Sequence, residues 1–116
     1  MKHFGTALFL LASLAFRGSA FGADQASIQK GEKVFNYWCA TCHGPGLPGT
    51  VALQTKYQGA KPALLSERTD LIPPVTKTFV RKGVSIMPFF RKTEISDADL
   101  DALAAYLARN NKARHP

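Results

Sequence analysis

The chain has 116 residues and a formal net charge of +7, which is enough for one small domain with a basic surface. The basic residues are scattered instead of clustered, which argues against a nucleic-acid-binding groove and favours an acidic protein partner. Apart from the N-terminal segment, no apolar run approaches the roughly 20 residues that a membrane span requires. We therefore expect a soluble mature protein without stable membrane insertion.

The N-terminal segment has the layout of a secretory signal peptide. A positively charged start is followed by a short apolar run and then by small residues, in the sequence MKHFGTALFLLASLAFRGSAFGAD. An N-terminal membrane anchor is the alternative, but Arg17 interrupts the apolar run and argues against it. The small residues offer three cleavage points, after Ala20, Gly22 or Ala23. We expect residues 1–23 to be a signal peptide and residues 24–116 to form one domain that is exported to the periplasm.

Hydrophobic periodicity predicts three main helices and no strands in this domain. The first helix is expected over about residues 27–41, with Ser27 as its N-cap. An interior glycine costs about 1 kcal/mol relative to alanine, so Gly31 inside this helix indicates a close contact with another helix. Residues 44–71 are expected to be mostly loop, with a short helical turn that has Pro62 at its first position.

The second helix is expected over about residues 74–82. A proline suits the first turn of a helix, and Gly83 is well placed to end this one. The segment VSIMPFFRK follows it. Because Pro88 disfavours helical geometry at Met87, this segment is expected to be extended or looped.

The third helix has the strongest signals at its start. Ser96 with Asp99 three residues later resembles a capping box, and further aspartates suit the positive end of the helix dipole. The apolar stripe of this helix consists of Leu100, Leu103, Ala104 and Leu107, with Tyr106 beside it. The expected fold class is therefore all-α.

The two cysteines of the chain, Cys39 and Cys42, lie three positions apart and directly before His43. A redox dithiol would need a strand before Cys39, and none is predicted. A zinc site needs four ligands, and only His115 near the C-terminus remains to complete one. A disulfide between these cysteines would close too small a loop to constrain the chain. Covalent haem attachment uses all three residues, because both thiols bond to the haem and the histidine ligates its iron.

Met87 is the best sixth iron ligand that the sequence offers. It is the only methionine of the mature chain, and it precedes a proline in an apolar loop. His115, the alternative, lies next to the C-terminus, where chains tend to fray. A core methionine that fills a packing gap is the other interpretation of Met87. With both axial positions filled, the iron would have no open site, and the protein would transfer electrons without being an enzyme by itself.

These residues resemble the small monohaem c-type cytochromes over most of the mature chain. Gly31 and Phe35 before CATCH resemble the first helix and haem motif of that family, VRKGVSIMP resembles the segment that leads to its axial methionine, and LDALAAYL resembles its terminal helix. The resemblance implies a cytochrome c fold, with three main helices and irregular loops around one covalent haem c. It also implies that the first and last helices cross at Gly31 and that Phe35 pairs with Tyr106.

The resemblance also assigns the site residues. Cys39 and Cys42 would be the thioether anchors of the haem, and His43 and Met87 the axial ligands of its iron. Many relatives orient the axial histidine with the carbonyl of a following proline. The candidates here are Pro45, Pro48 and Pro62, of which Pro48 is favoured.

A narrower resemblance concerns the partner. Residues 66–107 are similar to the cytochrome subunits of p-cresol methylhydroxylase-type flavocytochromes, including those that act on eugenol-like phenols. In these proteins an FAD subunit oxidises a 4-alkylphenol, and the cytochrome subunit passes the electrons to a downstream acceptor. A freely diffusing periplasmic carrier is the alternative. A catalytic or ligand-sensing haem protein is a third function, and it would require Met87 to be absent from the iron.

Overall fold

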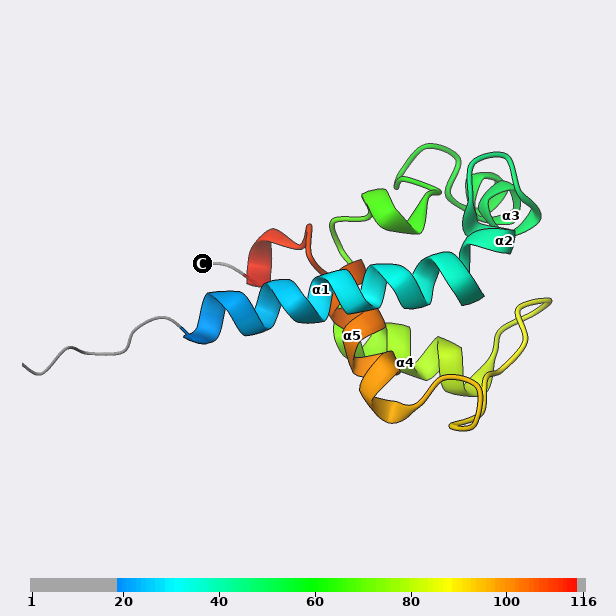
Figure 1. Ribbon diagram of the computed structural model, residues 1–116. Coiled ribbons are helices and arrows are strands. Elements are labelled where there is room, and N and C mark those ends of the chain that lie inside the picture. The colour runs from blue at the N-terminus through cyan, green and yellow to red at the C-terminus, as the bar shows by residue number, and fades with distance from the viewer. Residues whose placement is uncertain (1–18, 115–116) are drawn as a thin grey trace, which may run out of the picture.

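The structure is a computed structural model that describes residues 19–114. These residues contain helices and loops and no strand longer than one isolated bridge (Figure 1). The elements are α1 Ser19–Trp38, α2 Ala40–His43, α3 Pro48–Tyr57, η1 Leu65–Glu67, α4 Pro73–Lys82, α5 Asp97–Leu107 and η2 Lys112–Arg114. The all-α prediction is confirmed, and the three predicted main helices correspond to α1, α4 and α5.

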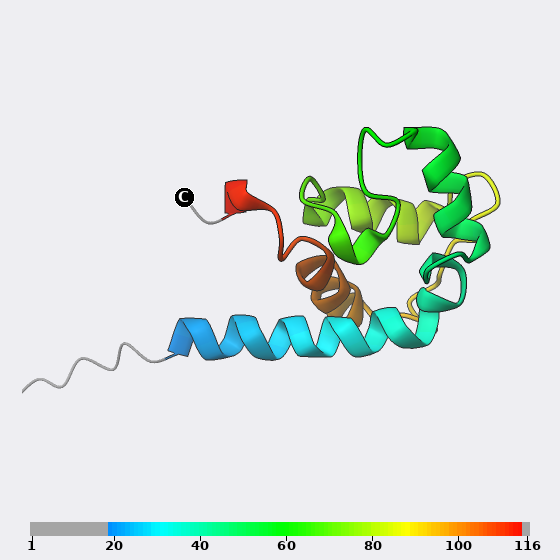
Figure 2. The same cartoon turned by 90° about the horizontal axis from the view of Figure 1, so that it is seen from above.

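The close crossing of α1 and α5 organises the fold, and Figures 1 and 2 show α5 lying across the middle of α1. The crossing is centred on Gly31, which is buried. A Cβ atom added at Gly31 would lie 2.0 Å from the carbonyl oxygen of Ala102 and 2.7 Å from the Cβ of Tyr106. Only glycine therefore allows the two backbones to approach this closely, as the interior glycine predicted.

The main core lies along the inner face of α5. The rings of Phe35 and Tyr106 pack with their centroids 5.6 Å apart, which confirms the predicted pair. Leu103 and Ile95 are fully buried beside them. The predicted apolar stripe of the last helix is buried along its whole length, at Leu100, Leu103, Ala104 and Leu107.

The ends of α4 and α5 follow from local signals. The Ser96 side chain accepts a hydrogen bond from the backbone N–H of Asp99 at 3.1 Å, which confirms the predicted cap. Helix α4 begins with Pro73 at its first position, one residue earlier than predicted. It ends at Gly83, whose φ of 69° is a left-handed conformation that favours glycine.

The predicted bounds of the first helix were wrong at both ends. Helix α1 begins at Ser19 instead of Ser27, so Ser27 lies inside the helix and does not cap it. The residues before Ser27 include several alanines and no proline, so nothing in the sequence stops the helix from extending backwards. At the other end α1 stops at Trp38, and Cys39 separates it from the short helix α2. The expected signal peptide lies mostly in residues 1–18, outside the described residues.

The prediction that residues 44–71 are mostly loop was wrong for α3. Pro48 stands at the first position of this ten-residue helix, where its missing N–H and fixed φ are not harmful. The short turn predicted to start at Pro62 exists as η1, but it begins later, at Leu65. Prolines in this segment therefore start a helix as well as interrupt one, and the sequence pattern did not separate the two roles.

A buried arginine holds the segment between α3 and α4. The Arg68 side chain is only 6% exposed, and it forms a two-bond ion pair with Asp70 at 2.6 and 2.8 Å. Its guanidinium lies 4.8 Å from the ring centre of Tyr57, and Lys61 donates to Asp70 at 2.7 Å. These contacts hold the pKa of Asp70 well below its usual range, mainly through the hydrogen bonds from Arg68.

No helix within the described residues is long and apolar enough to cross a membrane.

Replacing Gly31 with alanine should destabilise the protein strongly. The added methyl group would overlap the Ala102 carbonyl, and separating α1 from α5 should cost about 3 kcal/mol, which outweighs the roughly 1 kcal/mol that alanine gains in helix propensity. Urea unfolding gives the free energy directly. Gln29→Ala, at an exposed position of the same helix, is the control and should stay within about 0.5 kcal/mol of the wild type. Equal stability of Gly31→Ala and Gln29→Ala would contradict the close crossing.

Replacing Asp70 with asparagine should have a pH-dependent effect. A carboxyl group whose pKa is lowered by folding stabilises the fold above its unfolded pKa of about 4, and this contribution is lost as the pH falls towards the lowered value. Because the Asp70 side chain is 40% exposed, we expect Asp70→Asn to lower the free energy of unfolding by only about 1 kcal/mol at pH 7. Urea unfolding of both proteins should show the difference shrinking between pH 4 and pH 2. If the two proteins differ in unfolding free energy by the same amount at pH 7 and pH 2, the ionised carboxylate of Asp70 is not the cause.

Candidate functional site

The CATCH segment forms one helical turn at the end of α1. The backbone N–H of Cys39 donates to the carbonyl of Phe35 at 2.8 Å, so the segment continues directly from the helix. The N–H groups of Cys42 and His43 both donate to the carbonyl of Cys39, at 3.1 and 2.9 Å. Residues three and four apart lie on the same side of a helical turn. Cys39 therefore lies on the same side of the turn as Cys42 and as His43.

The side chain of His43 has two properties that suit a metal ligand. Its side chain is half-buried, and its Nδ1 is buried without a hydrogen-bond partner among the described residues. Burial lowers the pKa of His43, which favours the neutral imidazole that binds metals. A buried polar atom without a partner is costly. The predicted hydrogen bond from His43 to a proline carbonyl, such as that of Pro48, is not formed in the structure.

The start of α3 packs directly against the CATCH turn. A Cβ atom added at Gly49 would lie 2.8 Å from the carbonyl oxygen of Cys42 and 3.1 Å from Cε1 of His43. Any larger residue at position 49 would push α3 away from the imidazole. Gly49 thus sets how closely the chain surrounds His43.

The environment of the cysteines argues against a redox dithiol and against a zinc site. Both thiols are free, with Cys39 half-buried and Cys42 exposed. Burial, with a smaller effect of Cys42, raises the pKa of the Cys39 thiol to about 11, whereas reactive dithiols have a lowered pKa. Residues 19–114 contain no group of three or more His, Cys, Asp or Glu side chains that could hold a metal ion. His115, the remaining zinc ligand considered, lies outside the described residues.

Met87 lies in a tight turn after α4. Its N–H donates to the carbonyl of Val84 at 2.9 Å, and the N–H of Val84 donates back at 3.1 Å. Ser85, with a φ of 52°, and the exposed Ile86 form the tip of this turn. Met87 itself is half-buried and packs against the core, as does Cys39. Both views show α2 and this turn at the same end of the molecule, where α1 finishes (Figures 1 and 2).

Helix α4 carries a second apolar stripe that the protein core does not cover. Thr76 and Val80 are buried on one side, whereas Ile72, Val75 and Phe79 are exposed. Small soluble domains rarely leave such a stripe uncovered without a ligand or partner. A shallow hollow of about 200 Å³ lies along part of it.

Other exposed apolar side chains occur near the CATCH turn and the methionine turn, at Leu47, Val51, Val84, Ile86 and Phe89. The hollow on α4 is not lined by the cysteines or by His43, so it is no site by itself. Together, the exposed apolar residues and the unpaired imidazole fit a large apolar cofactor such as haem, bound to CATCH.

Gly49 and Gly83 make close contacts with His43 and with the methionine turn, which the sequence did not reveal. Gly83 was predicted only as a helix end, yet a Cβ atom there would lie 2.8 Å from the carbonyl oxygen of Met87. Gly49 was expected in a loop. A glycine leaves no periodic pattern in the sequence that would indicate such a close backbone contact.

The comparison with protein families identifies the class of protein. Residues 26–107 match the model of the family described as cytochrome c oxidase, cbb3-type, subunit III. This range includes the CATCH turn, Met87 and α5. Searches of curated proteins and of solved structures gave no significant match.

The helical fold and this match define the protein as a small c-type cytochrome. The chain belongs to the cbb3-type cytochrome c oxidase subunit III family. It therefore binds haem c covalently and is an electron-transfer protein, not an enzyme by itself. The match names no flavin-containing partner.

Proposed function

We propose that the chain transfers single electrons through one haem c held by four residues. Cys39 and Cys42 form the thioether bonds, and His43 and Met87 are the axial ligands of the iron. The observation that carries the proposal is the CATCH turn, which places both thiols and a half-buried imidazole with an unpaired Nδ1 in one helical turn. Met87 packs on the same core as Cys39, which supports its role as the second ligand.

Each of these residues has a separate task. When bound, the haem supplies a one-electron iron couple. Cys39 and Cys42 hold the cofactor permanently, so it is not lost between reactions with different partners. His43 and Met87 would both ligate the iron of the bound haem and would leave no open position on it for a substrate or oxygen. The soft thioether of Met87 favours the reduced iron and raises the reduction potential.

We also propose that residues 1–23 are removed during export and that residues 24–116 act in the periplasm. The layout of the N-terminal segment supports this. Cleavage after Ala20, Gly22 or Ala23 would shorten α1 only in its first turns. Figure 1 shows these turns extending beyond α5, and the crossing at Gly31 lies further along the helix.

For the electron donor we propose an FAD-containing dehydrogenase subunit that oxidises 4-alkylphenols. The resemblance of residues 66–107 to flavocytochrome subunits supports this partner. The segment 71–93 contains five basic residues and no acidic one, and it also carries the exposed Ile86 and Phe89. Lys77, Arg81 and Lys92 pair with aspartates of α5, so within this segment Lys82 and Arg91 remain to meet an acidic protein surface together with the exposed apolar side chains. The alternative is a free carrier between respiratory complexes, and the family match does not favour either partner over the other.

Replacing Met87 with alanine should open the iron. The reduction potential should fall by on the order of 100 mV or more, because a thioether ligand is lost, and cyanide should bind without delay. Redox titration and stopped-flow absorbance measure the two effects. Ile86→Ala, which truncates the neighbouring residue that is 79% exposed, should leave both unchanged. An unaltered spectrum and potential in Met87→Ala would show that Met87 is not an iron ligand.

The partner can be tested by size-exclusion chromatography of the protein from its native periplasm, followed at haem and flavin wavelengths together. We expect flavin to co-elute with haem at a mass well above that of one small domain. Adding 4-alkylphenol to that fraction should then reduce the haem. Haem that elutes alone at the monomer mass would contradict the flavocytochrome proposal and favour the free carrier.

A further inference from the structure

The turn that carries Met87 folds back onto the end of α4 and is attached at both of its ends. At the near end, Gly83 lies under the backbone of the turn, since a Cβ atom there would meet the Met87 carbonyl oxygen at 2.8 Å and the Phe89 nitrogen at 3.0 Å. At the far end, the N–H of Phe90 donates to the carbonyl of Val80 at 2.8 Å. The position of Met87 therefore depends on what holds these two ends.

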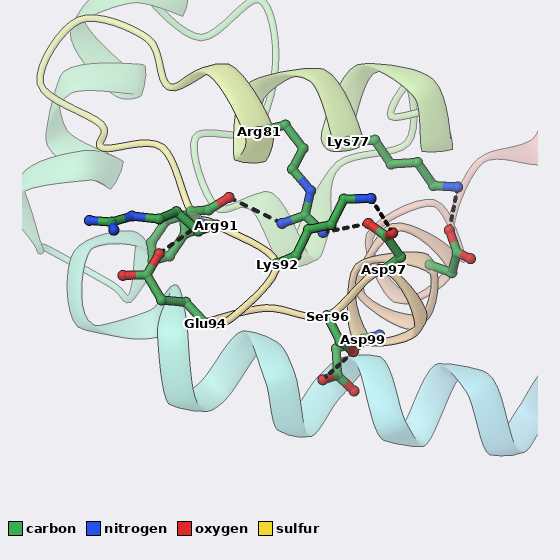
Figure 3. Close-up of polar contacts among 10 residues, drawn as sticks. Lys77, Arg81, Arg91, Lys92, Glu94, Ser96, Asp97 and Asp99 are labelled. Atoms are coloured by element: carbon green, nitrogen blue, oxygen red, sulfur yellow. Dashed lines mark hydrogen bonds and ion pairs between the residues drawn. The ribbon is translucent and has the colours of Figure 1, made fainter.

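Arg81 adds a side-chain connection at the far end, as Figure 3 shows. Its Nη1 donates to the carbonyl of Phe90 at 3.1 Å, and its Nη2 donates to Asp97 Oδ1 at 2.9 Å. Lys92, just beyond the turn, donates to the other carboxylate oxygen of Asp97 at 2.7 Å. One guanidinium thus connects α4, the methionine turn and the first residue of α5.

We propose that Arg81 is a positioning residue that keeps Met87 on the iron. The proposal rests on the assignment of Met87 as the axial ligand. A movement of the turn away from the haem would take Met87 off the iron, and such a movement pulls on Phe90 and on its bond to Arg81. The planar fork of arginine reaches Phe90 and Asp97 at once, whereas the single ammonium group of a lysine cannot reproduce this geometry.

The contact is better protected than an ordinary surface ion pair. The Arg81 side chain is 23% exposed, against 73% for Lys92. Its partner Asp97 is 60% exposed, however, and ion pairs with an exposed member contribute little to global stability. The effect of Arg81 should therefore appear in the opening of the turn, and only weakly in the unfolding of the whole domain.

The structure offers a matched control. Lys77 lies one turn earlier on α4 and also forms an ion pair with α5, through Asp101, but it does not contact the methionine turn. Lys77→Met therefore removes one positive charge and one ion pair between the same two helices. Arg81→Met removes the same charge together with the bond to Phe90, and Arg81→Lys keeps the charge while losing the fork.

The experiment measures the rate of cyanide binding to the oxidised haem protein, because cyanide binds only when Met87 has left the iron. We expect Arg81→Met to bind cyanide about tenfold faster than the wild type, as for the loss of one hydrogen bond to a charged group. Arg81→Lys should be several-fold faster, and Lys77→Met should match the wild type. The thermal midpoints of Arg81→Met and Lys77→Met should be similar. If Arg81→Met does not fold, Asp97→Asn replaces it and should also bind cyanide several-fold faster.

The outcomes separate the two proposals. Equal cyanide rates in Arg81→Met and Lys77→Met would overturn the role of Arg81, as would a wild-type rate in both Arg81→Lys and Asp97→Asn. Met87→Ala is included as a reference. If it binds cyanide at the wild-type rate, the axial assignment itself is wrong and the role of Arg81 falls with it. If it binds at once while the Arg81 variants match Lys77→Met, only the role of Arg81 is overturned.

Discussion

The contact between Gly31 and the backbone of Ala102 is the constraint on which the rest of this structure depends. It brings α1 and α5 together without an intervening side chain and so places Phe35 on Tyr106. The direction of α1 then determines where the CATCH turn lies, because this turn continues directly from the helix. The same crossing orients α5, whose first two turns receive the ion pairs from α4 at Asp97 and Asp101. The close contact at Gly31 thus helps to fix the position of the CATCH turn, through α1, and of the methionine turn, through α5 and α4.

Close backbone packing recurs around the site itself. Gly49 lets α3 approach His43, and Gly83 lets the methionine turn fold over the end of α4. At both places a proposed ligand residue is positioned by the main chain of a neighbouring segment, and at the second place Arg81 adds a side-chain bond. This arrangement suits an electron-transfer protein, because rigid ligands change little when the iron changes its charge. It also leaves apolar side chains to surround the cofactor, since few polar groups are needed to hold the ligands.

The sequence predicted those features that depend on local or periodic signals. The cap at Ser96, the stripe of α5 and the end of α4 at Gly83 each follow from a few neighbouring residues. The CATCH motif was found because its chemistry requires its spacing. The start of α1 was missed because its first residues suit a helix as well as a signal peptide, and α3 was missed because Pro48 can begin a helix or a loop. The role of Arg81 could not be predicted, since its partners are nine and sixteen residues away and belong to different elements.

The central claim is that His43 and Met87 hold the iron between them, and methyl NMR of the protein labelled with ¹³C-methyl methionine tests it most directly. The chain has two methionines, and Met1 would be removed with the signal peptide. In the reduced, diamagnetic protein, a methyl group bound through its sulfur to haem iron lies over the ring, so its proton resonance should be shifted far upfield. The account predicts one such resonance from Met87. A Met87 methyl at the chemical shift of an ordinary core methionine would contradict it.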